Sequence, residues 1–132
     1  MLQIDVNLLD KIALVARRYP EKAADIIQGI KYNQILSKHQ VLKELPLSGE
    51  LHVGVLGGWY GIGFMVLSRR ANTKFTLIDL DPSCKMVGDM IKYPSFSFLT
   101  GDACNIDTSP YDVLINCSSE HMNREALKHS FE

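Results

Sequence analysis

The feature that most constrains the fold of this chain is a regular alternation of short apolar runs with helical patterns, which begins at residue 51. The apolar runs predict strands and the intervening patterns predict helices. Strands that alternate with helices pair in parallel through right-handed crossovers. We therefore expect an α/β fold with a parallel sheet of about four strands in the order 3-2-1-4. The expected strands cover residues 51–56, 74–79, 96–100 and 111–116, and the expected helices residues 61–70, 82–92 and 120–131.

Residues 5–45 have a different spacing of apolar residues and are predicted to be helical. Apolar side chains recur there at spacings of three and four residues, as on one face of a helix. Tyr19 and Pro20 interrupt this pattern, and Pro20 suits the first position of a second helix. The whole chain is expected to form a single domain, in which residues 1–47 are a helical cap and residues 48–132 the α/β core.

Charge and composition exclude several classes of protein. The 14 Lys and Arg residues nearly balance the 15 Asp and Glu residues, so extended nucleic acid is not expected as a partner. No apolar stretch approaches the roughly 20 residues of a membrane helix, and residues 1–5 lack the features of a signal peptide. The three cysteines show no C-x-x-C spacing, so we expect free thiols and no metal site. These observations predict a soluble, cytoplasmic protein.

The first two expected strands end in residues suited to a ligand. In open α/β sheets, ligands bind beyond the carboxyl ends of the strands. The first strand ends in the turn Gly57-Gly-Trp-Tyr-Gly61, where glycines permit a positive φ and close approach of a ligand. A tight turn without a ligand would have the same sequence. Asp79 ends the second strand 22 residues after Gly57, a position from which a carboxylate can bind ribose hydroxyls, while Asp81 is expected to cap the helix at Pro82.

The third and fourth strands also end in polar side chains. Asp102 follows the third strand and can accept from an adenine amino group or stabilise its own turn. The fourth strand ends in the dense polar segment Asn116-Cys-Ser-Ser-Glu-His121, the sharpest candidate for a reactive site. One of its serines is expected to cap the last helix, but that role does not account for Asn116 and His121 together.

Three stretches together resemble the class I S-adenosylmethionine-dependent methyltransferases, and most closely a subgroup of small proteins from phages and bacteria. That subgroup reads V-x-G-G-W-Y-G, then I-D-x-D-P, then D-x-x-I-N-x-S-x-E-H-M. The corresponding stretches here are Val55-Leu-Gly-Gly-Trp-Tyr-Gly61, Ile78-Asp-Leu-Asp-Pro82 and Asp112-Val-Leu-Ile-Asn-Cys-Ser-Ser-Glu-His-Met122. The resemblance spans residues 51–122 and implies a Rossmann-like core that binds S-adenosylmethionine.

The resemblance also implies roles for individual residues. The glycine turn would surround the methionine part of the cofactor, Asp79 would hold the ribose, and Leu80 and Asp102 would contact adenine. Asn116 would face the reacting methyl group, and His121 or Glu120 would accept a proton. The implied cofactor-binding residues are Gly57, Gly58, Trp59, Gly61, Asp79, Leu80 and Asp102.

Two departures from the wider family stand out. Val55 and Trp59 occupy positions where the family usually has an acid and a glycine. Methyltransferases of this class commonly have seven strands, whereas this core is truncated to four strands and one further helix. An open edge at strand 111–116 predicts a homo-oligomer, unless the N-terminal helices cover that edge in a monomer.

Three functions follow from this reading. The leading one is a methyltransferase that acts on a small-molecule or otherwise unknown acceptor. The second is a module that binds S-adenosylmethionine or its product without transferring a methyl group. A nicotinamide-dinucleotide domain is less favoured, because the pattern G-x-G-x-x-G fails in every register: from Gly57 it meets Trp59 and Ile62, and from Gly61 it meets Val66.

Overall fold

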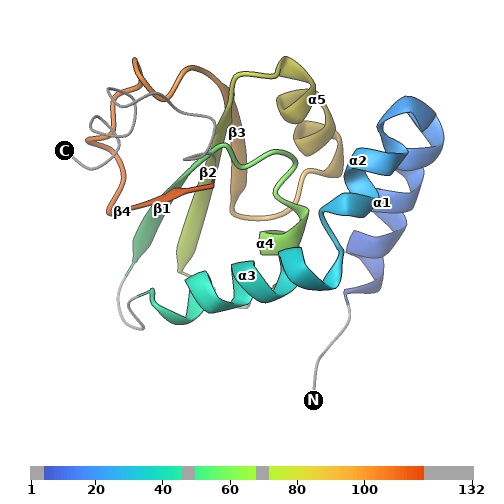
Figure 1. Cartoon of the computed structure of the whole chain (residues 1–132), viewed down its shortest axis with the longest axis horizontal. Coiled ribbons are helices and arrows are strands. Elements are labelled where there is room, and N and C mark those ends of the chain that lie inside the picture. Colours follow the sequence, from blue (N-terminus) through green and yellow to red (C-terminus); the bar gives the residue numbers. More distant parts are fainter. Residues whose placement is uncertain (1–4, 46–49, 68–71, 118–132) are drawn as a thin grey trace.

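A computed structural model describes residues 5–45, 50–67 and 72–117 of the chain (Figure 1). Its centre is a parallel four-stranded sheet in the order β3-β2-β1-β4, as predicted. The strands are β1 (Leu51–Leu56), β2 (Thr73–Asp79), β3 (Phe96–Thr100) and β4 (Val113–Asn116). The expected helix over residues 120–131 lies outside the described residues.

Strands β1 and β3 have the predicted bounds, and β2 begins one residue earlier than expected. Strand β4 is shorter than expected and begins at Val113 rather than residue 111. The reason is a local exchange at its start. The N–H of Asp112 donates to the carbonyl of His52 (2.8 Å), and the carboxylate of Asp112 accepts from the N–H of His52 (2.8 Å). The N–H of His52 is thus bonded to the side chain of Asp112 and not to a backbone carbonyl, so the regular pairing of β4 with β1 begins only at Val113.

The N-terminal cap consists of three α-helices and one turn of 3-10 helix. They are α1 (Val6–Arg18), η1 (Pro20–Lys22), α2 (Ala23–Gln28) and α3 (Tyr32–Lys43). Asp5 caps α1, because its Oδ1 accepts from the N–H of Leu8 at 3.0 Å. The break at Tyr19 and Pro20 was predicted. The turn around Gly29 was not: the sequence indicated one continuous apolar stripe there, but the N–H of Gly29 closes a short turn on the carbonyl of Ile26.

One face of the sheet has two central rows of apolar side chains and carries the helices, and Thr73 and Asp79 of β2 lie on the same face. The strand register places Val53, Phe75, Phe96 and Val113 in one row, and Val55, Leu77, Phe98 and Ile115 in the next. Helix α5 (Pro82–Ile91) packs on β3 and β2, and helix α4 (Ile62–Leu67) contacts these rows through Phe64, whose ring centre lies 5.9 Å from that of Phe75. Helix α3 packs on α4, and α1 on α5. The core side chains that the helices contribute include Leu8, Ile12, Val15, Ile26, Phe64, Met65, Val87 and Ile91.

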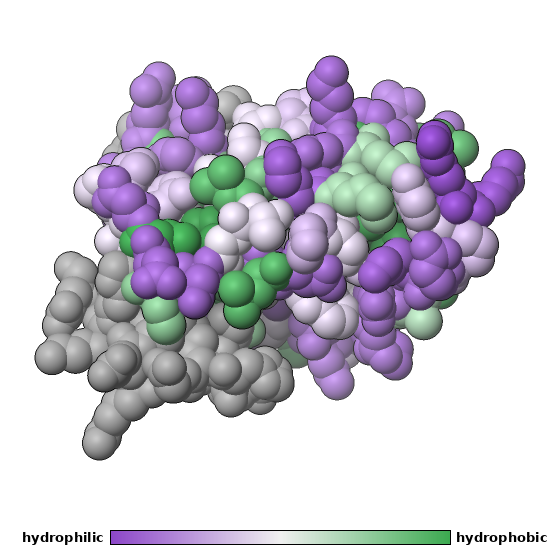
Figure 2. Space-filling model, turned by 90° about the horizontal axis from the view of Figure 1, so that it is seen from above, coloured by the Kyte–Doolittle hydropathy of each residue, from purple (hydrophilic) through white to green (hydrophobic). Residues whose placement is uncertain are grey.

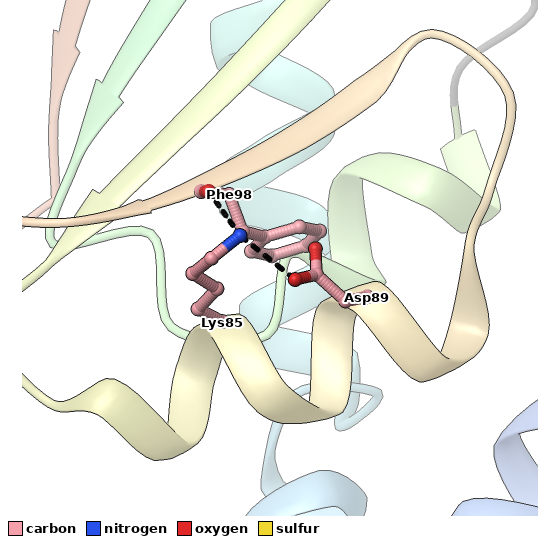
Figure 3. Close-up of polar contacts among 3 residues, drawn as sticks. All are labelled: Lys85, Asp89 and Phe98. Carbon is pink, nitrogen blue, oxygen red and sulfur yellow. Dashed lines mark hydrogen bonds and ion pairs between the residues drawn. The ribbon is translucent and has the colours of Figure 1, made fainter.

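Helix α5 is fixed against β3 by close packing and by one lysine. Asp81 caps it as predicted, accepting from the N–H of Ser83 at 2.9 Å. Lys85 Nζ donates to Asp89 Oδ2 at 2.8 Å and to the carbonyl of Phe98 at 3.3 Å (Figure 3). Gly88 faces the ring of Phe98 so closely that an added Cβ would lie 2.4 Å from its carbons.

The opposite face of the sheet is more polar and is covered by the connection from β3 to β4, which contains no helix in its residues 101–112. His52 Nε2 lies 2.8 Å from Thr76 Oγ1, and the His52 ring contacts the edge of Tyr111. Tyr111 fits because Gly54 has no side chain: a Cβ there would lie 2.8 Å from its Cγ. No helix in the described ranges is long and apolar enough to cross a membrane.

Candidate functional site

A cavity of about 830 Å³ lies at the carboxyl ends of the strands. This is where open α/β sheets bind ligands, and the volume is within the range of small-molecule sites. In Figure 1 the loops after β2 and β3 lie at the top of the molecule. Figure 2 views the molecule from above and shows apolar residues between polar ones near the middle of this face. The cavity is therefore a mixed polar and apolar site at the predicted edge of the sheet.

The glycine turn forms the floor of the cavity. Gly57 and Gly61 both have a positive φ (69° and 71°), the conformation that the sequence predicted for glycine here. The turn also packs tightly on Leu77, since a Cβ on Gly58 would lie 2.7 Å from its Cδ2. The turn is consequently held close to β2, and its glycines line the cavity.

Asp79 joins the glycine turn to the end of β2. Its Oδ2 accepts from the N–H of Trp59 at 3.3 Å, and its Oδ1 accepts from the N–H of Asp81 at 3.1 Å. The carboxylate is half-buried and lines the cavity. Each carboxylate oxygen has two lone pairs, so both oxygens keep acceptor capacity for a ligand.

Asp102 serves its own turn and also lines the cavity. Its Oδ1 accepts from the N–H of Cys104 at 2.9 Å, so the turn-stabilising alternative from the sequence is confirmed. The same side chain lies among the cavity residues, together with Leu80, whose side chain is 68% exposed. The two predicted adenine contacts therefore share one end of the cavity, where β2 and β3 end.

The structure brings all seven predicted cofactor-binding residues into this one cavity: Gly57, Gly58, Trp59, Gly61, Asp79, Leu80 and Asp102. The predicted catalytic residues Asn116, Glu120 and His121 are not among the described residues that line the cavity. Asn116 pairs with Leu56 at the end of β4 and is not part of the cavity wall, whereas the next residue, Cys117, is. Glu120 and His121 lie outside the described residues.

The N-terminal helices contribute wall residues that the sequence analysis missed. Helix α3 supplies Gln34 and Lys38, spaced four residues apart, and Lys38 Nζ donates to Gln34 Oε1 at 3.3 Å. The available signal was a polar pair at helical spacing, Gln34 and Lys38. The remaining wall residues that were not predicted are Asp25, Gln28, Gly29, Tyr60, Ile62, Gly63, Phe64, Ile78, Gly101, Ala103, Cys104 and Cys117.

Charges are distributed unevenly around the wall. Asp25, Asp79 and Asp102 are its carboxylates, and Lys38 is the only cation among the lining residues described. Burial raises the pKa of the Cys117 thiol, and the nearby ammonium of Lys38 opposes that shift without cancelling it. The thiol is accordingly protonated at neutral pH and is a poor nucleophile.

Tyr60, in the cavity wall, and Cys84, in α5, carry neutral side chains at neutral pH. Burial, and to a smaller extent the charge of Asp25, raises the pKa of the Tyr60 phenol. Burial raises the pKa of Cys84 to about 12, with smaller effects from Asp79 and Asp81. The chemically relevant charges of the cavity are therefore its three carboxylates and one ammonium.

Comparison with known proteins identifies the class of fold. No protein-family model and no curated protein matches the chain. Among solved structures, a SAM-dependent methyltransferase from Aquifex aeolicus matches with a TM-score of 0.56 and 17% identity, over 69% of this chain and 54% of that chain. A mutant of MtNAS in complex with S-adenosylmethionine matches with a TM-score of 0.62 and 15% identity, over 93% and 50%. PKMT2 from Rickettsia typhi in complex with S-adenosylhomocysteine matches with a TM-score of 0.54 and 14% identity, over 64% and 18%.

The chain thus has the Rossmann-like fold of S-adenosylmethionine-dependent methyltransferases. It spans about half the length, or less, of these structural neighbours. At such low identity the likeness concerns the fold, because one fold carries many functions.

Proposed function

We propose that this chain binds S-adenosylmethionine in the cavity at the strand ends and transfers its methyl group to an acceptor. The observation that carries the proposal is the convergence of seven residues, chosen from separate stretches of sequence, on one cavity of suitable size. These residues come from three loops that only the sheet topology brings together. The residues present fit the cofactor, because they offer a flat glycine turn and acidic acceptors in the order that its parts require.

The strand order supports one orientation of the cofactor. Because the sheet runs β3-β2-β1-β4, the corresponding loops follow one another along the cavity. Adenine would lie between Leu80 and Asp102, and the ribose hydroxyls would donate to Asp79. The methionine part would then cross the turn Gly57–Gly61 toward the end of β4.

The two helical charges suit the amino-acid end of the cofactor. Val55 occupies the position of the family's usual acid and is fully buried, so β1 offers no charge at this point. Lys38 lines the cavity, its Nζ lies 5.7 Å from the centre of the Phe64 ring, and its charge opposes the raised pKa of Cys117, the residue after β4. Asp25 likewise acts on Tyr60 in the glycine turn. We propose that Asp25 binds the ammonium of the methionine part, the role that β1 leaves unfilled, and that Lys38 binds its carboxylate.

Methyl transfer does not require the protein to form a covalent bond with the substrate. A bound sulfonium makes its methyl carbon electrophilic, so the chain must align a nucleophile with that carbon and accept a proton where one is released. Asn116, at the end of β4, is proposed to orient the acceptor, and Glu120 or His121 to take the proton. In this proposal the Cys117 thiol stays protonated and takes no part in the reaction.

A non-catalytic binding module is the second candidate. One observation favours it: the seven candidate cofactor-binding residues line the cavity, whereas Asn116 does not. A binding module would take up S-adenosylmethionine and return it unchanged.

Calorimetry with S-adenosylmethionine, S-adenosylhomocysteine and NAD in parallel tests the proposal. We expect one molecule of each adenosyl ligand to bind per chain, and NAD to give no heat. Absence of binding by both adenosyl ligands would overturn the proposal. Incubation of the chain with methyl-labelled cofactor and a panel of small-molecule acceptors then separates the two candidates, because only a methyltransferase moves the label.

A further inference from the structure

Trp59 has a backbone conformation that its side chain disfavours. Its φ is +51°, in the left-handed region, and it stands between Gly57 and Gly61, which have φ values of 69° and 71°. Glycine takes this conformation without strain, whereas a Cβ makes it unfavourable. Glycine would therefore suit the middle of this turn better than tryptophan.

The indole of Trp59 does not offset this strain by packing in the core. Trp59 is 48% exposed, and its nearest described aromatic neighbour is the ring of Tyr60, tilted by 41° at 5.8 Å. The residue lines the cavity, and its N–H donates to Asp79 Oδ2. Strained residues that persist with little burial are concentrated at ligand sites. The conformation of Trp59 thus indicates a role toward a ligand.

The position of Trp59 defines which part of a ligand it meets. It belongs to the turn after β1 and is hydrogen-bonded to the carboxylate that ends β2. A cofactor with its ribose on Asp79 and its methionine part along the turn has its sulfur at the junction of the two, next to Trp59. The other aromatic wall residues, Tyr60 and Phe64, are 5% and 0% exposed, so Trp59 is the one of these three with a ring surface available to a ligand.

We infer that Trp59 is a specificity-determining residue whose indole face contacts the sulfonium of S-adenosylmethionine. An aromatic face attracts a cation, and tryptophan does so best. The product S-adenosylhomocysteine has a neutral thioether and lacks this attraction. Trp59 therefore favours the charged methyl donor over the spent product. This inference rests on the proposed function, since it requires the cofactor to bind in this cavity.

The test measures affinities for S-adenosylmethionine and S-adenosylhomocysteine in the wild type, Trp59→Phe and Trp59→Leu. Leucine keeps an apolar side chain and the backbone strain but removes the ring face. We expect Trp59→Leu to weaken binding of S-adenosylmethionine by about 2- to 30-fold, the range of a cation–π contact, and to change binding of S-adenosylhomocysteine by less than about twofold. Phenylalanine should give an intermediate loss for the charged ligand.

Trp59→Gly separates a ligand role from a structural one. Glycine relieves the positive φ, so this variant should melt at the same temperature as Trp59→Leu or higher, while losing at least as much affinity for S-adenosylmethionine. Equal losses for both ligands in Trp59→Leu, or a lower melting temperature for Trp59→Gly, would overturn the inference. Wild type that binds neither ligand would overturn the proposed function and this inference together. Wild type that binds both, with an affinity ratio unchanged in Trp59→Leu, would overturn the inference alone.

Discussion

Removal of the Asp79 carboxylate is the substitution that separates a ligand role most sharply from a structural one. Asp79 ends β2 and lines the cavity, and its oxygens accept from the N–H groups of Trp59 and Asp81. If it also accepts from two ribose hydroxyls, Asp79→Ala removes two hydrogen bonds to a charged group. Each is worth about 1.5–3 kcal/mol and the pair is not fully additive, so the loss is on the order of 2–4 kcal/mol. We expect affinity for S-adenosylmethionine to fall by about 30- to 1,000-fold.

Asp81→Ala is the matched control. It removes the same charge two residues away, together with the hydrogen bond that caps α5. A helix cap contributes about 1 kcal/mol, which corresponds to a melting temperature lower by about 4 °C for a domain of this size. Asp79→Ala also loses backbone hydrogen bonds, so the two variants should have similar stability. Affinity measured by calorimetry, with stability followed by thermal melting, distinguishes them. Equal losses of affinity in the two variants would refute the assignment of Asp79.

Three further predictions concern packing, charge and assembly. Gly88→Ala places a methyl group against the ring of Phe98 and should destabilise the fold by about 1–3 kcal/mol in urea unfolding; unchanged stability would contradict the close packing of α5 on β3. Lys38→Met should weaken binding of S-adenosylmethionine about tenfold or more, because Lys38 lines the cavity. Lys43→Met, which changes an exposed residue of the same helix, should leave this affinity unchanged. Equal losses of affinity in the two variants would contradict the proposed carboxylate contact. Strand β4 pairs with β1 alone among the described strands, so we propose a homo-oligomer through this edge; a mass near 14.8 kDa in sedimentation at micromolar concentration would contradict it.

The strands and their order follow from local features of the sequence. The apolar runs at 51–56 and 96–100 are bounded by glycine, proline or polar residues, and the bounds of both strands were predicted correctly. The handedness of crossovers then restricts the order of the sheet. The candidate cofactor-binding residues were accessible to the same reasoning, because each lies at or just after a strand end and parallel strands place those ends at one edge.

The contribution of the helical cap could not be predicted in this way. Whether a helix reaches the cavity depends on how it packs, and that packing involves residues far apart in sequence. Helix α3 lies close to α4 because Gly63 has no side chain: a Cβ there would lie 3.1 Å from Lys38 Cγ. The turn at Gly29, which separates α2 from α3, was not predicted because apolar residues continue on both sides of it, as they would in one uninterrupted helix.

The role of Asn116 shows a limit of reading strand ends as a group. Successive strand residues point to opposite faces, so Asn116 is on the face opposite Ile115. Ile115 belongs to the apolar row under the helices, and Cys117 packs against the same core. Ile78, which lies in the same row as Asn116, lines the cavity, whereas Asn116 does not and the next residue, Cys117, does.

The most direct test of the central claim, that the cavity at the strand ends binds S-adenosylmethionine, is a titration followed by amide chemical shifts in NMR. Gly57, Gly58, Gly61 and Gly101 line the cavity, whereas Gly54 and Gly88 are packed elsewhere under Tyr111 and Phe98. We predict saturable shifts of the first four amides and little change in the other two. Shifts confined to Gly54 or Gly88, or no shifts at millimolar ligand, would contradict it.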